Sequence, residues 1–280
     1  MGDVLPLQIS DIDEAARVFQ QGLHREVPRG HETLPLIRSN LRKYVCFVFK
    51  ENGKIEGLVW FKQMRNHITL EFICSRKLRR GIGYKLMLSV VKYAAQRKIS
   101  RIWSGVSLRD KRASEFYHSL GFRNQKKTGH FGYYIKASTE DILKLASKNA
   151  SDFLKTVTGI TIAAPKVVFS TKVRDAAWYG HGKININPNY NPENLTYEEM
   201  IAHEFFHHAQ TKLHTEYDEN IWESSAMFFA AACVTKSKSP NKIINYLNEK
   251  EHIPKEGNDR VLFIFKQNNY DVKKTLLHLL

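Results

Sequence analysis

The sequence predicts an α/β unit built on a central sheet in residues 1–137, followed by a mainly helical α+β unit in residues 138–280. The first half alternates between strand patterns and helix patterns. The second half contains a few short strand patterns among long stretches of helical periodicity. A chain of 280 residues, 42% of them hydrophobic, has the length and apolar content for two separate cores.

In the first half, alternation of apolar and polar residues marks the strands, and apolar residues three and four apart mark the helices. Asn52-Gly53 is a strong turn signal and predicts a hairpin, and Gly121 is suited to end a helix. The predicted order is strand Leu5–Ile9, helix Asp11–Gly22, helix Glu32–Lys43, strands Tyr44–Lys50, Lys54–Gln63 and His67–Cys74, helix Gly81–Lys98, strand Ile99–Val106, helix Asp110–Leu120 and strand Phe131–Lys136.

The second half begins near Ser138-Thr139-Glu140-Asp141, whose short polar side chains favour a helix start. Thr196 and Glu199 have the spacing of a capping box, which predicts that a later helix begins there. The predicted order is helix 140–157, strands Val167–Ser170, Ala176–Tyr179 and Lys183–Ile186, a loop over Asn187–Asn194, a helix from Thr196, helix Asp218–Val234, and helices over 240–250 and 258–279.

Composition excludes several classes of protein. No run approaches the roughly 20 apolar residues of a membrane span, and the first residues lack the basic and apolar regions of a secretory signal. Cys46, Cys74 and Cys233 lie far apart and form neither a disulfide framework nor a Cys-x-x-Cys zinc site. We therefore expect a cytoplasmic protein without a membrane partner.

The net charge of +15 lies wholly in the first half of the chain. Residues 1–137 contain 26 Lys and Arg against 11 Asp and Glu, whereas residues 138–280 contain 17 of each. Such a field attracts coenzyme phosphates, an acidic protein or nucleic acid, although a Lys-rich solvated surface explains the same charge without a ligand. Because no known nucleic-acid-binding motif accompanies the charge, nucleic-acid binding is the less favoured interpretation.

Arg79-Arg80-Gly81-Ile82-Gly83 follows a strand pattern and opens a helix pattern. Backbone N–H groups at a helix start point outward and the helix dipole favours negative charge, so the stretch predicts a phosphate cradle. Gly-x-Gly alone is weak evidence, since glycines also serve ordinary turns. The later stretch Ala113-x-x-Phe116-Tyr117-x-x-x-Gly121-Phe122 adds specificity because it follows the cradle after one further strand.

Together these motifs, in this order over residues 4–137, resemble the GNAT family of N-acetyltransferases. The resemblance implies a mixed sheet with splayed central strands, acetyl-CoA as co-substrate, and transfer of the acetyl group to an amine. The family's phosphate motif is Arg/Gln-x-x-Gly-x-Gly/Ala, so Leu78 departs from its first position. The neighbouring arginines can substitute for that contact.

The resemblance also assigns roles to single residues. Tyr117 matches the tyrosine that protonates the departing thiolate, with a packed aromatic ring as the alternative. Glu71 lies on the splayed strand where many members place a base for the acceptor amine, with an ordinary exposed carboxylate as the alternative. The coenzyme would be bound by Ile73 and Cys74 at its pantetheine arm and by Arg79, Arg80, Gly81, Ile82, Gly83, Tyr84 and Lys85 at its pyrophosphate.

His203-Glu204-Phe205-Phe206-His207 is an unrelated second signature. Positions i and i+4 share one face of a helix, so both imidazoles can bind one ion, and His-Glu-x-x-His is the zinc motif of metallopeptidases, with the glutamate as general base. The match can arise by chance, but its place in a capped amphipathic helix makes chance a weaker explanation. His208 points about 100° away from His207 and is expected to take no part.

A zinc site needs a third protein ligand, and Glu223 in Trp222-Glu223-Ser224-Ser225-Ala226 resembles the third ligand of gluzincin peptidases, in the style of the small minigluzincins. The resemblance implies zinc bound by His203, His207 and Glu223, with Glu204 activating a water. Strand Lys183–Ile186 could then pair with an extended peptide along a free edge. Candidates for stabilising the oxyanion are His181, His214, Tyr217 and Tyr246.

The sequence therefore predicts a bifunctional enzyme, an acetyl-CoA-dependent N-acetyltransferase in residues 1–137 joined to a zinc metallopeptidase in residues 138–280. The acetyl acceptor would be a peptide, a protein or a small amine. The alternative is an acetyltransferase whose zincin-like second half is catalytically idle and binds a peptide or partner.

Overall fold

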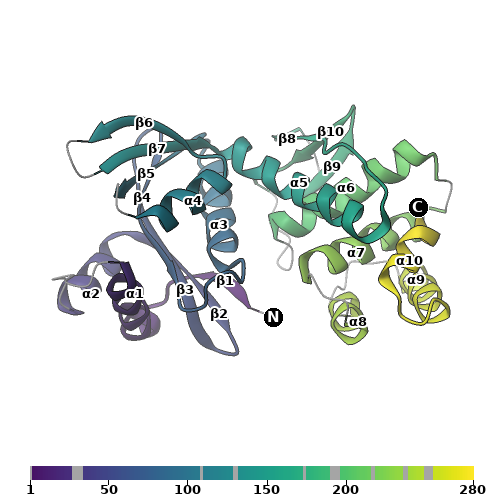
Figure 1. The fold of residues 1–280 in the computed structure, drawn as a ribbon, viewed down its shortest axis with the longest axis horizontal. Coiled ribbons are helices and arrows are strands. Elements are labelled where there is room, and N and C mark those ends of the chain that lie inside the picture. The colour runs from purple at the N-terminus through teal and green to yellow at the C-terminus, as the bar shows by residue number, and fades with distance from the viewer. Residues whose placement is uncertain are drawn as a thin grey trace. The chain divides into compact units, whose positions relative to one another are not determined.

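The computed structural model describes residues 2–26, 34–107, 110–128, 132–172, 175–189, 196–215, 218–235, 239–248 and 255–280 (Figure 1). The chain divides into two compact units, Met1–Ile142 and Leu143–Leu280. The division falls inside one helix, Thr139–Thr158, because that helix starts in the first unit and continues into the second. The predicted boundary at residue 137 lies just before this helix. No helix among the described residues is long and apolar enough to cross a membrane.

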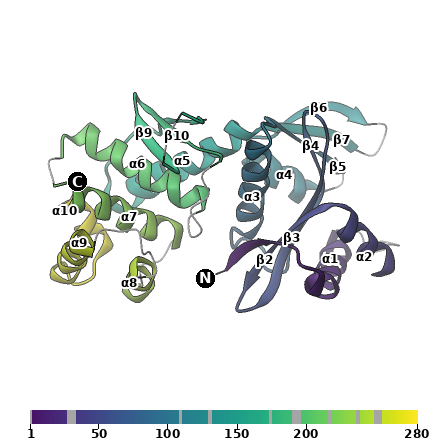
Figure 2. The ribbon, with the colours of Figure 1, turned by 180° about the vertical axis from the view of Figure 1, so that it is seen from behind.

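The first unit is a seven-stranded sheet with helices on both faces. Its sheet order is β1-β2-β3-β4-β5-β7-β6, and all neighbours are antiparallel except β4 and β5. Figures 1 and 2 place α1 and α2 on one face of this sheet and α3 on the other. The elements are β1 (Asp3–Pro6), a short 3-10 helix (Ile9–Asp11), α1 (Ile12–Glu26), α2 (Leu34–Lys43), β2 (Val45–Glu51), β3 (Lys54–Gln63), β4 (Ile68–Ser75), α3 (Ile82–Gln96), β5 (Arg101–Ser107), α4 (Lys111–Ser119), β6 (Arg123–Thr128) and β7 (Gly132–Ser138).

The core between the sheet and α1 is aromatic. Phe19 of α1 is 2% exposed and stacks on Trp60 of β3 with ring centroids 4.3 Å apart. The same Phe19 ring lies 4.1 Å from the ring of Phe72 on β4. Because α1 packs against β3 and β4, it helps to hold β4, the strand that carries the predicted coenzyme-binding residues Ile73 and Cys74.

The two parallel strands of this sheet separate after a short pairing. β4 and β5 pair only over Ile68–Leu70 and Ile102–Ser104. Beyond these residues β4 continues to Ser75 and β5 to Ser107 without pairing with each other. The sheet is therefore mixed, and its central strands splay apart as expected from the sequence.

The second unit is mainly helical, with one small sheet of order β8-β10-β9. α6 and α7 pack against each other, and Phe206 of α6 stacks on Phe229 of α7 with ring centroids 4.9 Å apart. Both rings are fully buried. The elements are α5 (Thr139–Thr158), β8 (Lys166–Phe169), β9 (Ala177–Gly180), β10 (Lys183–Ile186), α6 (Tyr197–Leu213), α7 (Glu219–Thr235), α8 (Pro240–Asn248), α9 (Lys255–Gln267) and α10 (Val272–Leu279).

One prediction about this sheet is wrong. Strand Lys183–Ile186 has no free edge, because β10 pairs in parallel with β8 on one side and antiparallel with β9 on the other. A tight turn at His181-Gly182, both with positive φ, folds β9 back onto β10. The outer strand of this hairpin is β9, which contacts the helix that carries the histidines.

Two further details differ from the sequence prediction. β6 was not predicted, because the stretch Arg123–Thr128 is wholly polar and shows no apolar alternation. The helix predicted over 258–279 is two helices, because Asn269 and Tyr270 take positive φ values of 54° and 58° and Asp271 caps the second helix. The predicted strand start at Phe131 and the loop residues 190–194 lie outside the described residues.

Candidate functional site

The first candidate site is the start of α3. Gly81 is the N-cap residue of this helix and has φ +72°, a left-handed conformation that suits glycine. A Cβ added there would meet nothing within 4 Å, so conformation rather than space requires the glycine. At Gly83 the opposite holds, because an added Cβ would lie 3.0 Å from the ring of Phe116. This close contact packs α4 onto α3.

Ion pairs fasten the loop that leads into this helix. The backbone N–H of Arg76 donates to the Glu56 carbonyl at 2.7 Å. Lys77 pairs with Glu51 at 3.2 Å and with Glu56 at 3.1 Å, and hydrogen bonds to these carboxylates raise the pKa of Lys77. Arg80 also approaches Glu51, at 3.9 Å. The loop is therefore held against the β2–β3 hairpin before the chain enters the helix.

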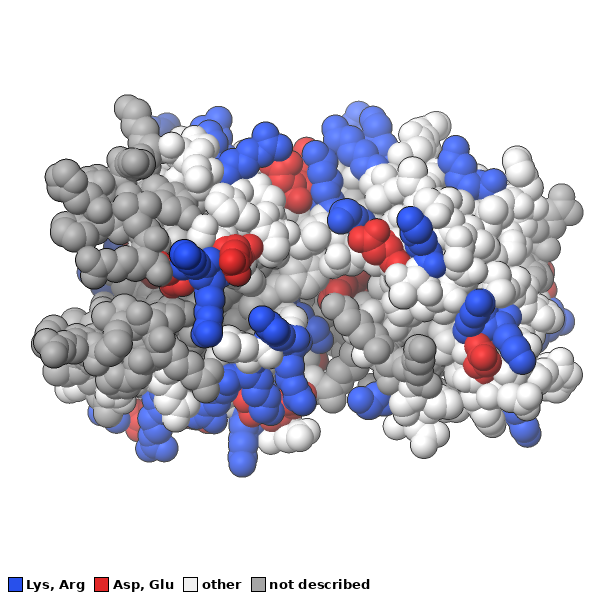
Figure 3. Space-filling view, in the orientation of Figure 1, with Lys and Arg blue, Asp and Glu red and all other residues white. Residues whose placement is uncertain are grey.

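The predicted phosphate-binding residues Arg79–Lys85 lie together around this turn, but their charged side chains differ in exposure. Arg79, Arg80 and Gly81 are exposed. Lys85 is half-buried, and its ammonium lies 5.7 Å from the ring centroid of Phe49. On the face drawn in Figure 3, Lys and Arg are interspersed with carboxylates, so ion pairs neutralise part of the positive charge.

Tyr117 lies at the start of the splay between β4 and β5. Its ring is 5% exposed, and its hydroxyl accepts a hydrogen bond from Ser104, the last β5 residue that pairs with β4 (3.1 Å). Ile73 and Cys74 lie on the part of β4 that has left β5, so one side of their strand is open within the described sheet. Tyr117, Ile73 and Cys74 therefore border the same opening in the sheet.

Glu71 is the first residue of β4 beyond the segment that pairs with β5, and its carboxylate contacts Lys62 at 3.1 Å. Lys62 also lies 4.8 Å from the ring centroid of Tyr44. The hydrogen bond to Glu71 is the main cause that raises the pKa of Lys62. As placed here, Glu71 is an ion-paired carboxylate and would have to leave Lys62 to accept a proton.

Beside the splay lies an aromatic and cationic group that the sequence analysis missed. The ring centroid of Trp103 on β5 lies 6.4 Å from that of Tyr134, 5.9 Å from that of His67 and 5.8 Å from the ammonium of Lys136. Trp103 and Lys136 face each other across β5 and β7. Only the alternation of β5 could have suggested that Trp103 points to the face opposite Ile102.

The second candidate site lies between α6 and α7. The Nε2 atoms of His203 and His207 are 3.0 Å apart, and the Glu223 carboxylate lies 3.1 Å from the first and 3.3 Å from the second. The ligand atoms of all three side chains lie within 4.8 Å of one another. A tetrahedral site with bonds of 2.0–2.1 Å separates its ligands by about 3.3 Å, so this donor set fits zinc in spacing and in kind.

The two histidines are held by different neighbours. The Nδ1 of His207 lies 3.2 Å from Gln210 Oε1, which leaves Nε2 to face the carboxylate. The ring of Trp222 stacks parallel to the His207 ring at a centroid distance of 5.8 Å. The Nδ1 of His203 is buried and has no hydrogen-bond partner within the part of the chain that the structure describes. The capping box predicted at the start of this helix is confirmed, with Thr196 and Glu199 exchanging both bonds.

Electrostatics favour ionisation of the carboxylate. Burial raises the pKa of Glu223, but hydrogen bonds from His203 and His207 outweigh burial and lower its pKa well below the usual range. Burial likewise lowers the pKa of His203, yet the bond to Glu223 and the carboxylates of Glu204 and Glu223 raise it overall. The ionised Glu223 carboxylate therefore favours a proton on the His203 imidazole.

Glu204, the predicted general base, lines the same pocket as His203, His207 and Glu223. Glu204 is buried, with 8% of the residue exposed, and its carboxylate accepts a hydrogen bond of 2.6 Å from the backbone N–H of Tyr179 on β9. The pocket has a volume of about 660 Å³. Beside the three ligands and Glu204, its lining includes the large apolar side chains Trp178, Met200, Trp222 and Met227.

Of the predicted oxyanion residues that the structure describes, none lines this pocket. His181 lies exposed in the β9–β10 turn and His214 lies exposed at the end of α6. The hydroxyl of Tyr246 is buried and donates to Glu199 at 2.6 Å, and burial together with this carboxylate raises its pKa far above the usual range. Tyr217 lies outside the described residues.

His208 was expected to take no part in the zinc site, and it belongs neither to the three clustered side chains nor to the pocket lining. Its ring is buried, with Nδ1 2.8 Å from the Tyr179 hydroxyl and Nε2 3.1 Å from the Ala163 carbonyl. Burial lowers the pKa of His208. The sequence carried no signal for this contact, because Tyr179 is 29 residues away.

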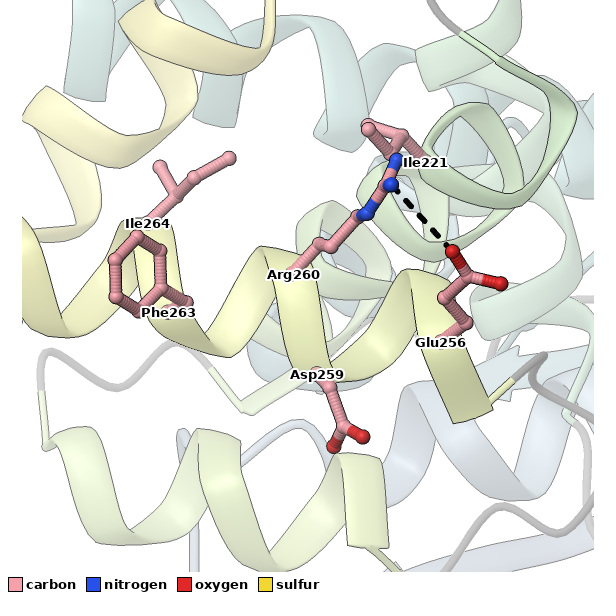
Figure 4. Close-up of a pocket in the computed structure, with 6 residues that line it drawn as sticks. All are labelled: Ile221, Glu256, Asp259, Arg260, Phe263 and Ile264. Carbon is pink, nitrogen blue, oxygen red and sulfur yellow. Dashed lines mark ion pairs between the residues drawn. The ribbon is translucent and has the colours of Figure 1, made fainter.

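A second hollow, of about 510 Å³, lies between α7 and α9 (Figure 4). Phe263 is 59% exposed there, and Ile221 and Ile264 complete its apolar lining. Arg260 pairs with Glu256 at 3.4 Å and with Asp218 at 2.7 Å. The lining residues include no imidazole or thiol, so this hollow offers none of the chemistry of the first two sites.

Comparison with known proteins identifies the first unit. Residues 12–122 match the model of the acetyltransferase (GNAT) family. No curated protein matches the chain. Residues 12–122 therefore form a GNAT acetyltransferase domain, and the family match does not reach α6 or α7 of the second unit.

Solved acetyltransferase structures are also similar to the chain. Ribosomal-protein-S18-alanine N-acetyltransferase from Escherichia coli has 19% identity and a TM-score of 0.43, covering 50% of this chain and 94% of that chain. PaiA N-acetyltransferase from Thermoplasma acidophilum, solved in complex with coenzyme A, has 15% identity and a TM-score of 0.43, covering 49% and 99%. An N-acetyltransferase from Staphylococcus aureus Mu50 has 19% identity and a TM-score of 0.43, covering 50% and 98%.

Proposed function

We propose that this protein is a bifunctional enzyme, in which the acetyltransferase unit modifies an amine and the second unit is a zinc-dependent peptidase. The observation that carries the second activity is the convergence of His203, His207 and Glu223, with ligand atoms 3.0–3.3 Å apart, beside the carboxylate of Glu204. Two histidines and one glutamate leave a fourth position for water, as catalytic zinc sites require.

For acetyl transfer, the start of α3 would hold the coenzyme phosphates through its N–H groups and the exposed Arg79 and Arg80. The acceptor nitrogen attacks the thioester carbonyl, so a C–N bond forms and the C–S bond breaks. Tyr117, at the splay of the sheet, would give its proton to the departing thiolate. Glu71 would take the proton of the amine once it separates from Lys62.

The aromatic and cationic group at Trp103 and Lys136 lies on the sheet beside that opening. It would favour an acceptor that carries a planar or anionic group near its amine, because the ring face binds flat groups and the ammonium attracts negative charge. A peptide N-terminus and a small amine both remain within this class.

For peptide hydrolysis, zinc held by the three side chains would supply a Lewis acid and an acidified water. Glu204 would accept a proton from the attacking water and deliver it to the leaving amine nitrogen as the C–N bond breaks. The outer strand β9 would place the peptide, and Trp178, Trp222, Met200 and Met227 would receive apolar side chains on either side of the scissile bond.

Peptide cleavage is tested with a quenched-fluorescent peptide library and the zinc-loaded full chain. We expect Glu204→Gln to keep its zinc and to lower kcat by about 10²–10⁴-fold, the usual contribution of general base catalysis. Full zinc occupancy without cleavage by the wild type would reject the peptidase and leave the alternative, an acetyltransferase with an idle peptide-binding unit.

Acetyl transfer is tested by thiol release from acetyl-CoA with the same peptides as acceptors. Tyr117→Phe should lower kcat by about tenfold or more and leave coenzyme affinity unchanged, because the proposed role of the hydroxyl toward the coenzyme is to protonate the departing sulfur. Equal kcat for the variant and the wild type would remove Tyr117 from the reaction.

A further inference from the structure

Helix α6 presents two neighbouring pairs of residues four apart. His203 and His207 face Glu223 of α7 and make the proposed zinc site. Glu204 and His208 are the next pair around the helix, and both contact one residue, Tyr179 of β9. The doubled histidine at 207–208 therefore serves two faces of the helix.

The two contacts of Tyr179 involve different groups of that residue. Its backbone N–H donates to Glu204 Oε2 at 2.6 Å, the short distance of a bond to a charged acceptor. Its phenol oxygen lies 2.8 Å from Nδ1 of His208. The rings of Tyr179 and His208 also pack together with centroids 4.9 Å apart.

The hydrogen-bond partners fix the tautomer of His208. The Ala163 carbonyl can only accept, so Nε2 of His208 carries the hydrogen of that 3.1 Å bond. In the neutral ring Nδ1 is then an acceptor, and the Tyr179 hydroxyl donates to it. Tyr179 is thus tied through His208 to a backbone carbonyl 45 residues away from that histidine in the sequence.

This arrangement has a consequence for catalysis. Glu204 has three side-chain torsions, and a general base must stay within hydrogen-bond reach of the water it deprotonates. The N–H of Tyr179 fixes the carboxylate, and it can do so only while β9 lies against α6. We propose that His208 and Tyr179 are positioning residues that hold β9 on α6 and so keep the Glu204 carboxylate at the metal centre.

This inference rests on the proposed peptidase function, and its main test does not require cleavage. Amide hydrogen exchange at residue 179 is read by NMR in the full-length zinc-loaded protein. We expect Tyr179→Phe and His208→Ala to speed exchange at this amide by about tenfold while zinc occupancy stays unchanged. Glu204→Ala removes the acceptor of this amide and should itself speed its exchange, so adding Tyr179→Phe should change the rate little.

Tyr197→Phe is the matched control. This hydroxyl also lies on α6 and is buried, but it has no hydrogen-bond partner among the described residues, so its loss should leave exchange at residue 179 and kcat unchanged. His208→Asn keeps an acceptor near the position of Nδ1 and should restore part of the protection lost in His208→Ala. Unchanged exchange at residue 179 in both Tyr179→Phe and His208→Ala would overturn the inference.

Cleavage kinetics give the second test. Loss of positioning should lower kcat by about tenfold or more with KM almost unchanged, because a displacement of about 1 Å at a reacting group can cost 10²-fold. A rise in KM alone would show that Tyr179 binds peptide and does not position the base, which contradicts the inference. If the wild type cleaves no peptide, the peptidase proposal fails, and the exchange measurement still decides whether this pair holds Glu204.

Discussion

Replacing Gly81 by alanine tests the physical account of the coenzyme cradle. The residue has φ +72°, and a Cβ added there would meet nothing within 4 Å. The left-handed conformation costs an alanine about 1–2 kcal/mol, and the loss of unfolded-chain freedom offsets about 0.4–1 kcal/mol of this. We therefore expect Gly81→Ala to lower the free energy of unfolding of the first unit by about 1 kcal/mol.

The assay is urea denaturation of the full chain, followed by a probe in the first unit, with coenzyme A titrated by calorimetry in parallel. Gly81→Asn is the control, because asparagine tolerates positive φ better than alanine and should cost less. A coenzyme Kd that weakens far more than the roughly fivefold equivalent of 1 kcal/mol would show that the methyl group also meets the phosphates. Unchanged stability in Gly81→Ala would refute the conformational argument.

Three further predictions follow from the second unit. Phe229→Ala removes a fully buried ring that stacks on Phe206 at 4.9 Å and should cost about 3–5 kcal/mol in denaturant unfolding, whereas Phe263→Ala, at a ring 59% exposed, should cost little. Zinc affinity should fall as the pH is lowered from 8 to 6, by about tenfold per pH unit below the raised pKa of His203. The reason is that the His203 ring must lose its proton to bind metal, while Glu223 stays ionised over this range. Zinc affinity is measured by competition with a chelator, and a constant affinity would contradict the prediction. Calcium should not compete with zinc in the same titration, since its 2.3–2.6 Å bonds need wider ligand spacing than 3.0–3.3 Å.

Features that depend on interactions between residues close together in the sequence could be predicted from the sequence. The capping box of Thr196 and Glu199 fixed where α6 begins, because both of its bonds are local. The four-residue spacing of His203 and His207 placed both rings on one face for the same reason. The GNAT resemblance rests on two such local motifs, Arg79–Gly83 and Ala113–Phe122, and on their order along the chain, and the family match covers residues 12–122.

Features that depend on partners distant in the sequence could not be predicted. The wholly polar strand β6 exists because β7 pairs with it, and β10 became a central strand because β8 and β9 both pair with it. His208 could not be assigned from its position on the helix, because its partners come from residues 163 and 179. Tyr246 does not line the pocket, and its hydroxyl donates to Glu199, a residue 47 positions away in the sequence.

The central claim is that the second unit holds a catalytic zinc ion. The most direct test is the metal content of the full-length protein, purified without a histidine tag, beside a His203→Ala variant. We predict about one zinc per chain in the wild type and almost none in the variant, because three protein ligands are the minimum of a catalytic site. A wild type that binds no zinc even after reconstitution would contradict the account.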